Sequence, residues 1–169
     1  MSTFLFGSEE NVRYLVNTIS DGKEALYPFY RFPGNEGGIS FINQETAKTK
    51  PANLIGEPVY PVTLKEILDS ITTDTVIIKI DVEGSECVAL TPYLTQPIKK
   101  KNIPYFLMEW TYIFQNIDDC CPGISTLIKG FLDSGYYAVE VTTLQRVNMT
   151  EPQNWDNILW VHNEAFRQF

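Results

Sequence analysis

The sequence contains a single histidine and three cysteines among its 169 residues. His162 has no second histidine and no serine or cysteine motif beside it, so a catalytic triad is not predicted. Cys120 and Cys121 are adjacent, while Cys87 stands alone on a predicted helix. This spacing favours neither a disulfide framework nor a CxxC metal site, and we expect reduced thiols.

Positive charge is also scarce, with 13 lysines and arginines against 21 aspartates and glutamates. A net charge of -8 argues against binding to nucleic acid, which relies on clustered basic residues. The one basic cluster, Lys99–Lys101, is expected to be a solvated connection. No apolar stretch approaches the roughly 20 residues that cross a bilayer, and Met1–Gly7 lacks the basic start of a signal peptide. We therefore expect a cytoplasmic protein with no membrane partner.

Length and composition predict one domain that spans residues 1–169, because 44% of the residues are hydrophobic and can form one sizeable core. Strands alternate with helices, which predicts an α/β fold with a largely parallel sheet. The segment 44–56 is polar and irregular, and we expect a mobile surface loop there. The expected strands are 11–19, 25–32, 38–43, 59–62, 75–81, 104–110, 136–141 and 158–162, and the expected helices are 63–70, 85–94 and 122–134.

The most informative segment runs from Thr75 to Glu86 and reads TVIIKIDVEGSE. Its apolar, mostly β-branched first half predicts a central strand that is buried on both faces. Lys79 is the one charge inside this strand, so a buried position would require a carboxylate partner or a route to solvent. The strand ends in a group of carboxylates before the next helix. In open α/β sheets, ligands bind at this end of the strands.

Three sequence blocks occur in an order that resembles the FkbM-like family of S-adenosylmethionine-dependent methyltransferases. The blocks are Val62–Leu68, Lys79–Glu86 and Tyr105–Trp110. The resemblance covers roughly residues 11–162 and implies a Rossmann-like methyltransferase sheet that begins at the family's third strand. Residues 136–141 and 158–162 would then form an antiparallel hairpin at the C-terminal edge of a mostly parallel sheet.

The family's first two strands and its glycine-rich turn have no counterpart, since no GxGxG pattern occurs in the sequence. We therefore expect an incomplete sheet, from a fragment of a longer protein or from a reduced member of the family. An open sheet edge must be covered or paired, and a homo-oligomer could cover it. S-adenosylmethionine is the cofactor that the resemblance implies.

The resemblance also implies roles for individual residues. Asp81 would lie near the transferred methyl group, where it could accept a proton from a substrate hydroxyl, or it could simply cap the following helix. Glu83 and Glu109 are further catalytic candidates, and Glu109 would face Asp81 across the crevice. Ile19 and Asp21 fall where relatives contact the adenine ring, so Ile19, Asp21 and Asp81 form the expected cofactor-binding set.

Simpler roles remain open for most of these residues. Glu83 and Glu86 carry the hard oxygen ligands that a divalent cation prefers, but a solvated acidic first turn is favoured and no metal site is predicted. Glu109 could instead pair with Lys79. Three aromatic residues after Glu109 could line an acceptor pocket but are more often core; they are Trp110, Tyr112 and Phe114.

The expected function is O-methylation of a small metabolite or a saccharide. The alternative is a non-catalytic scaffold or binding module derived from a methyltransferase. A metal-dependent hydrolase is disfavoured because the sequence has no histidine cluster.

Overall fold

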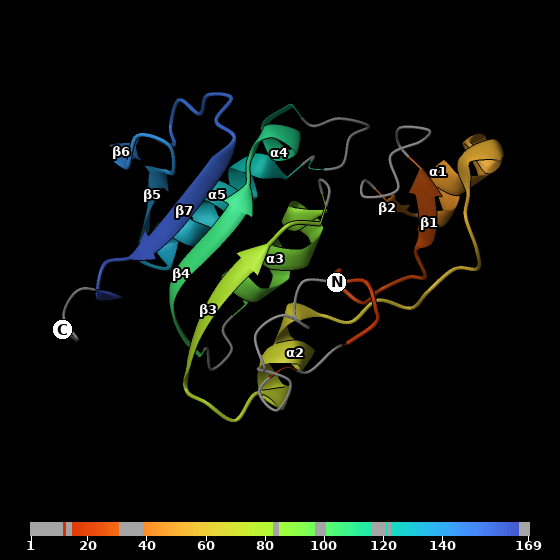
Figure 1. The fold of residues 1–169 in the computed structure, drawn as a ribbon, viewed down its shortest axis with the longest axis horizontal. Coiled ribbons are helices and arrows are strands. Elements are labelled where there is room, and N and C mark those ends of the chain that lie inside the picture. The colour runs from red at the N-terminus through yellow and green to blue at the C-terminus, as the bar shows by residue number, and fades with distance from the viewer. Residues whose placement is uncertain are drawn as a thin grey trace.

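The structure is a computed structural model that describes residues 12, 15–30, 39–82, 85–96, 101–115, 121 and 123–165, apart from the side chain of Tyr112. The described strands form a five-stranded sheet and a separate two-stranded sheet (Figure 1). Helices and strands alternate through the larger part of the chain. The predicted α/β class is therefore confirmed.

The five-stranded sheet has the order β3-β4-β7-β5-β6. In that order its strands are Thr75–Ile80, Asn102–Glu109, Asn157–His162, Tyr136–Glu140 and Gln145–Val147. β3 and β4 are parallel, whereas β4 with β7, β7 with β5, and β5 with β6 are antiparallel. The sheet is thus mixed, and the prediction of a mostly parallel sheet was wrong because β7 runs back between β4 and β5.

The arrangement of the last three strands of the chain also differs from the prediction. β5 and β7 do pair in the antiparallel sense, with Ala138 opposite Trp160. However, β7 lies inside the sheet, and the edge strand is β6, which the sequence analysis missed. β6 is short and mostly exposed, so it lacks the apolar pattern by which strands are recognised. Leu144, in the turn before it, has a positive φ of 57°.

One face of the five-stranded sheet is covered by α3, Glu86–Thr95, and α5, Ile124–Asp133 (Figure 1). Gly130 lets these helices approach closely, since a Cβ there would lie 3.0 Å from the Cβ of Leu94. α2, Leu64–Ser70, joins the same core, and α4, Thr111–Gln115, follows β4. No helix in the described part of the chain is long and apolar enough to cross a membrane.

The two-stranded sheet pairs β1, Tyr27–Tyr30, with β2, Ile39–Ile42, in the antiparallel sense, and both lie within expected strands. The segment after it is not the irregular loop that was expected. α1, Gln44–Thr49, begins there because the Oδ1 atom of Asn43 accepts the N–H of Thr46 at 2.9 Å. A 3-10 helix, Pro51–Asn53, follows. Helix α1 was not predicted because residues 44–49 carry a single apolar side chain, Ala47.

Two of the predicted strands shrink to isolated bridges. Ile19 bridges Val62 in the parallel sense, and Leu26 bridges Val59 in the antiparallel sense. Residues 15–18 are not strand, and the earlier part of the predicted strand 11–19 lies mostly outside the described residues. In the described residues, these two segments pair with each other through the bridge Ile19–Val62, and the second pairs with Leu26 through Val59, without a continuous ladder.

β3 is the edge strand of its sheet, not the doubly buried central strand that its sequence predicts. Ile80 is buried, and Val76 and Ile78 pack partly against the helix-covered core. Ile77 points the other way and is 69% exposed. Burial alternates along β3 because one face packs against the helix-covered core, whereas no helix of the described residues covers the other face (Figure 1). Among the described strands, β3 pairs only with β4.

Candidate functional site

The parallel pairing of β3 and β4 brings acidic side chains to one end of the sheet. Ile80 pairs with Met108, so Asp81 and Glu109 are the next residues on neighbouring strands. α3 begins five residues after Asp81, at Glu86, whose pKa is affected by both other acids. We call Asp81, Glu86 and Glu109 the carboxylate site.

Asp81 is the accessible member of the carboxylate site. Its side chain is 45% exposed, and its Oδ2 atom accepts a bond from the Nζ atom of Lys79 at 3.2 Å. The residue at the N-cap of α3 is Ser85, not Asp81. Lys79 is itself exposed, so the partner expected for a buried lysine is not needed.

Glu86 is the buried member, with 1% of its surface exposed. Its Oε1 atom accepts the backbone N–H of Val82 at 3.0 Å. Burial raises the pKa of the Glu86 carboxyl, and the neighbouring Glu109 and Asp81 raise it further. Among the described residues, its Oε2 atom is buried without a hydrogen-bond partner. Glu86 was expected in a solvated first turn, and only its helical spacing with Leu90 could have indicated burial.

The other predicted site residues fall in different places. Glu83 lies outside the described residues. Trp110 is fully buried in the core, where its Nε1 atom donates to the backbone oxygen of Gln153 at 3.1 Å. Phe114 is 37% exposed, and the side chain of Tyr112 is not described. Trp110 is therefore core, which is the simpler of its two predicted roles.

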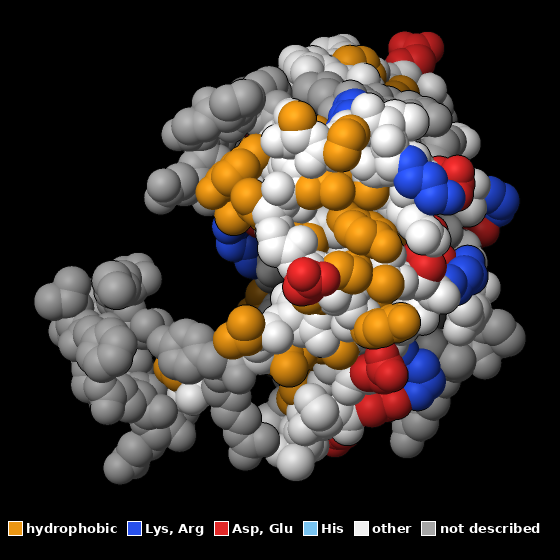
Figure 2. Space-filling view, turned by 90° about the vertical axis from the view of Figure 1, so that its right-hand side faces the viewer, with side chains coloured by type: hydrophobic (Ala, Val, Ile, Leu, Met, Phe, Trp, Pro, Cys, Tyr) orange, Lys and Arg blue, Asp and Glu red, His pale blue; other side chains and the backbone are white. Residues whose placement is uncertain are grey.

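A groove of about 680 Å³ runs along the outer side of β3, and we call it the β3 groove. It is bounded by β3, α2, β2 and residues 15–19, and its lining is mainly apolar. Ile19 and Asp81 both line this groove. Figure 2 shows hydrophobic side chains exposed on the side of the molecule that faces right in Figure 1, where β1, β2 and α1 lie.

The third residue of the predicted cofactor-binding set is placed differently. Asp21 does not line the β3 groove, and its Oδ2 atom lies 2.7 Å from the Nζ atom of Lys23. The structure thus brings Ile19 and Asp81 to one groove and leaves Asp21 engaged in a local ion pair.

The described residues match only part of S-adenosylmethionine. The apolar wall of the β3 groove suits an adenine ring, and Asp81 offers a carboxylate to a cationic group. The groove lining includes no glycine and only one cation, Lys79, which is paired with Asp81. A glycine-rich turn that could cradle the amino-acid part of the cofactor is therefore not among the lining residues. The described residues alone do not fit the whole cofactor.

A metal ion is not supported by the arrangement of the described side chains. Among the described residues, no group of three histidine, cysteine, aspartate or glutamate side chains is placed to hold one.

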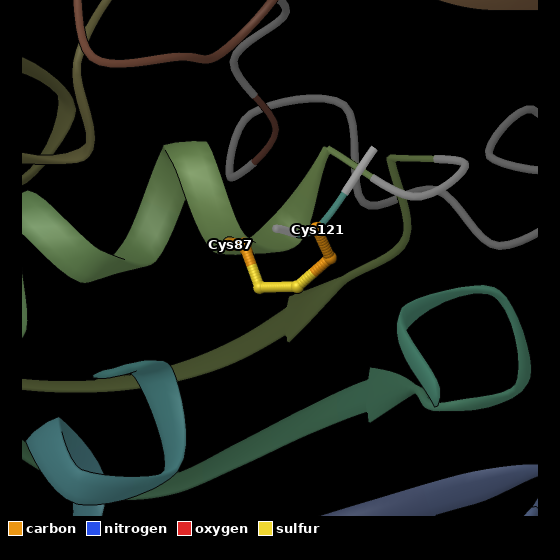
Figure 3. Close-up of a disulfide and its surroundings, with 2 residues drawn as sticks. All are labelled: Cys87 and Cys121. Atoms are coloured by element: carbon orange, nitrogen blue, oxygen red, sulfur yellow. A yellow bond between two sulfur atoms is a disulfide. The ribbon is translucent and has the colours of Figure 1, made fainter. Parts of the chain in front are cut away.

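A disulfide lies beside the carboxylate site and overturns the expectation of reduced thiols. It joins Cys87, in the first turn of α3, to Cys121, and their Cα atoms are 5.3 Å apart (Figure 3). Both cysteines are buried. Sequence spacing could not reveal the pair because 34 residues separate its members.

No protein-family model, no curated protein and no solved structure matches this chain. The structure alone defines its class, which is an α/β domain with a mixed sheet and an acidic site at the carboxyl ends of its parallel strands.

Proposed function

We propose that this chain takes part in S-adenosylmethionine-dependent methyl transfer to an oxygen atom of a small metabolite or a saccharide. The observation that carries the proposal is the carboxylate site, where Asp81 and Glu109 follow paired positions of parallel strands and Glu86 is buried beside them. Ligands of α/β proteins bind at this end of the sheet. The resemblance to FkbM-like methyltransferases supplies the reaction type.

Asp81 is the residue proposed to receive the proton of the acceptor hydroxyl. Its half-exposed carboxylate borders the β3 groove, so an acceptor can reach it from solvent. Removing that proton makes the acceptor oxygen a stronger nucleophile. S-adenosylmethionine, when bound, supplies an electrophilic methyl group. The described residues match part of the cofactor, and the role assigned to Asp81 is on the acceptor side of the reaction.

The charge of the site limits the acceptor. Asp81, Glu86 and Glu109 are all acids, and the one nearby cation that lines the groove, Lys79, is already paired with Asp81. An anionic acceptor such as a phosphate would be repelled by these carboxylates. A neutral hydroxyl compound is favoured, which agrees with a saccharide or a small uncharged metabolite.

A second candidate function is a non-catalytic binding module. It is favoured by the partial match between the β3 groove and the cofactor, and by the free edge of β3. The homo-oligomer predicted to cover this edge stays a prediction, which sedimentation of the purified chain would test. A monomer at all accessible concentrations would contradict it.

Calorimetric titration with S-adenosylmethionine and S-adenosylhomocysteine tests the main proposal. We expect saturable binding of both compounds, and turnover with a neutral acceptor that falls by about 100-fold or more in Asp81→Asn. Asp133→Asn is the matched control, because Asp133 pairs with Lys129 on the exposed side of α5. No binding by folded wild-type protein would contradict catalysis by this chain and would favour the binding module.

A further inference from the structure

We propose that Glu86 is a positioning residue of the carboxylate site, that it is protonated in the folded protein, and that it holds the turn that carries Asp81. Its effect on catalysis rests on the proposed function. Its protonation and its structural effect do not, and they can be measured without any ligand.

The geometry shows how Glu86 acts on Asp81. The carboxyl group of Glu86, in the first turn of α3, reaches back to the backbone N–H of Val82 at 3.0 Å. Val82 directly follows Asp81, so this bond restrains the chain where it leaves β3. Val82 also packs against the core cluster. Glu86 therefore ties the end of β3 to the start of α3.

Burial determines the protonation state in which Glu86 accepts the hydrogen bond from Val82. Only 1% of the residue is exposed, and its Oε2 atom is buried without a partner among the described residues. An ionised carboxylate in such a place carries a large desolvation cost unless a cation compensates it. A neutral carboxylic acid can still accept the N–H of Val82 through Oε1.

The charged groups that act on Glu86 from neighbouring elements are acids. Asp81 lies at the end of β3 and Glu109 at the end of β4, and both disfavour a third negative charge. On α3 itself, Cys87 is bonded to Cys121 and does not titrate. The cation of β3, Lys79, is paired with Asp81. A neutral Glu86 also keeps an additional negative charge away from the proposed base.

The protonated state has a defined effect on stability. Because the pKa of Glu86 is raised in the folded protein, the folded state binds more protons than the unfolded state above the ordinary pKa of 4.5. The free energy of unfolding therefore falls as pH rises from about 4.5 toward the folded-state pKa. Glutamine resembles the neutral acid in shape, so Glu86→Gln should remove this contribution.

Denaturant unfolding of the wild type, Glu86→Gln and Glu86→Ala between pH 4 and pH 8 tests the proposal. We expect Glu86→Gln to match the wild type at pH 4 and to gain stability relative to it as pH rises. Glu86→Ala should be less stable than Glu86→Gln throughout. The control is Glu45→Gln, an exposed residue of α1 that pairs with Lys48, and its difference from wild type should not follow this pH pattern.

Infrared spectroscopy supplies an independent measurement. As pH rises above 4.5, the folded wild type should keep a carboxylic-acid C=O band that Glu86→Gln lacks. A missing band, or a Glu86→Gln protein that is unfolded or as destabilised as Glu86→Ala, would overturn the proposal. These results do not depend on cofactor binding, so the two proposals can fail separately. If turnover is found, Glu86→Gln should retain it and Glu86→Ala should lower kcat.

Discussion

Phe131 of α5 stacks on Trp160 of β7, with ring centroids 4.3 Å apart and an interplanar angle of 8°. Both side chains are fully buried. Phe131 also meets Phe106 of β4 edge-on, at a centroid distance of 5.3 Å. This aromatic group joins one helix to two neighbouring strands and forms the centre of the core.

Removing the stacked ring should strongly destabilise the protein. We expect Phe131→Ala to lower the free energy of unfolding by about 3 to 5 kcal/mol, because it leaves a cavity against Trp160. Leu132→Ala is the control, since Leu132 is 44% exposed on the same helix. Urea unfolding measures both variants, and an equal decrease in the free energy of unfolding would contradict the assigned packing.

Glu140 should contribute stability that depends on pH in the sense opposite to Glu86. Its carboxylate accepts the N–H of Thr142 at 2.9 Å and the N–H of Thr143 at 2.7 Å, as well as the hydroxyl of Thr143. Hydrogen bonds with Thr143, and then with the Thr142 backbone, lower the pKa of Glu140 to about 2. The stabilisation is therefore complete well above the ordinary pKa of 4.5 and is lost as pH falls toward 2.

Glu140→Gln should accordingly be less stable than the wild type at pH 7, and the difference should shrink at acid pH. Thermal unfolding from pH 2 to pH 7 measures this. Glu151→Gln provides an exposed acidic control that should show little difference at any pH. A constant gap between Glu140→Gln and the wild type would show that ionisation is not the cause.

The disulfide should add stability by restricting the unfolded chain. For a separation of 34 residues, loop closure predicts a contribution of about 3 to 4 kcal/mol. Cys121→Ser should lose this amount under non-reducing conditions, whereas Cys120→Ser should keep the bond. Peptide mapping by mass spectrometry identifies the pair. Recovery of only free thiols from oxidised protein would refute the assignment.

Gly22 should tolerate no side chain. It has a φ of +75°, and a Cβ atom there would lie 2.9 Å from the Cγ2 atom of Thr63. Gly22→Ala should cost more than about 1 kcal/mol, because strain and overpacking add. Gly123→Ala is the matched control, since a Cβ at Gly123 meets nothing within 4 Å. A neutral Gly22→Ala variant in thermal unfolding would contradict this local geometry.

The edge position of β3 predicts unequal effects for two of its isoleucines. Ile80→Ala should cost about 2 to 5 kcal/mol because Ile80 is buried, whereas Ile77→Ala should change stability by about 0.5 kcal/mol or less. The comparison also tests the predicted second copy. If Ile77→Ala is costly only at high protein concentration, another chain covers the strand.

Local sequence signals predicted several elements well. Helix 63–70 was predicted, and Thr63 and Glu66 form a capping box at the start of α2, with Glu66 accepting the N–H of Thr63 at 2.8 Å. The apolar spacing of 122–134 predicted α5, and the run 104–110 predicted β4. These signals work because capping and helical periodicity depend on residues only a few positions apart.

The candidate site could be predicted only in part. Asp81 and Glu109 follow paired positions of β3 and β4, because the apolar runs before them pair in parallel. The burial of Glu86 and the bond between Cys87 and Cys121 depend on how α3 packs, which no local pattern reports.

The sequence by itself determined the α/β class, the capped helix α2 and the acidic end of β3, since each follows from neighbouring residues. Only the tertiary structure decided that β7 lies between β4 and β5, that β3 is an edge strand, and that Glu86 is buried while Asp81 is accessible. The physical reason is that strand order and burial depend on contacts between residues far apart in the chain. The apolar run of β3 has the same composition whether one neighbour covers it or two.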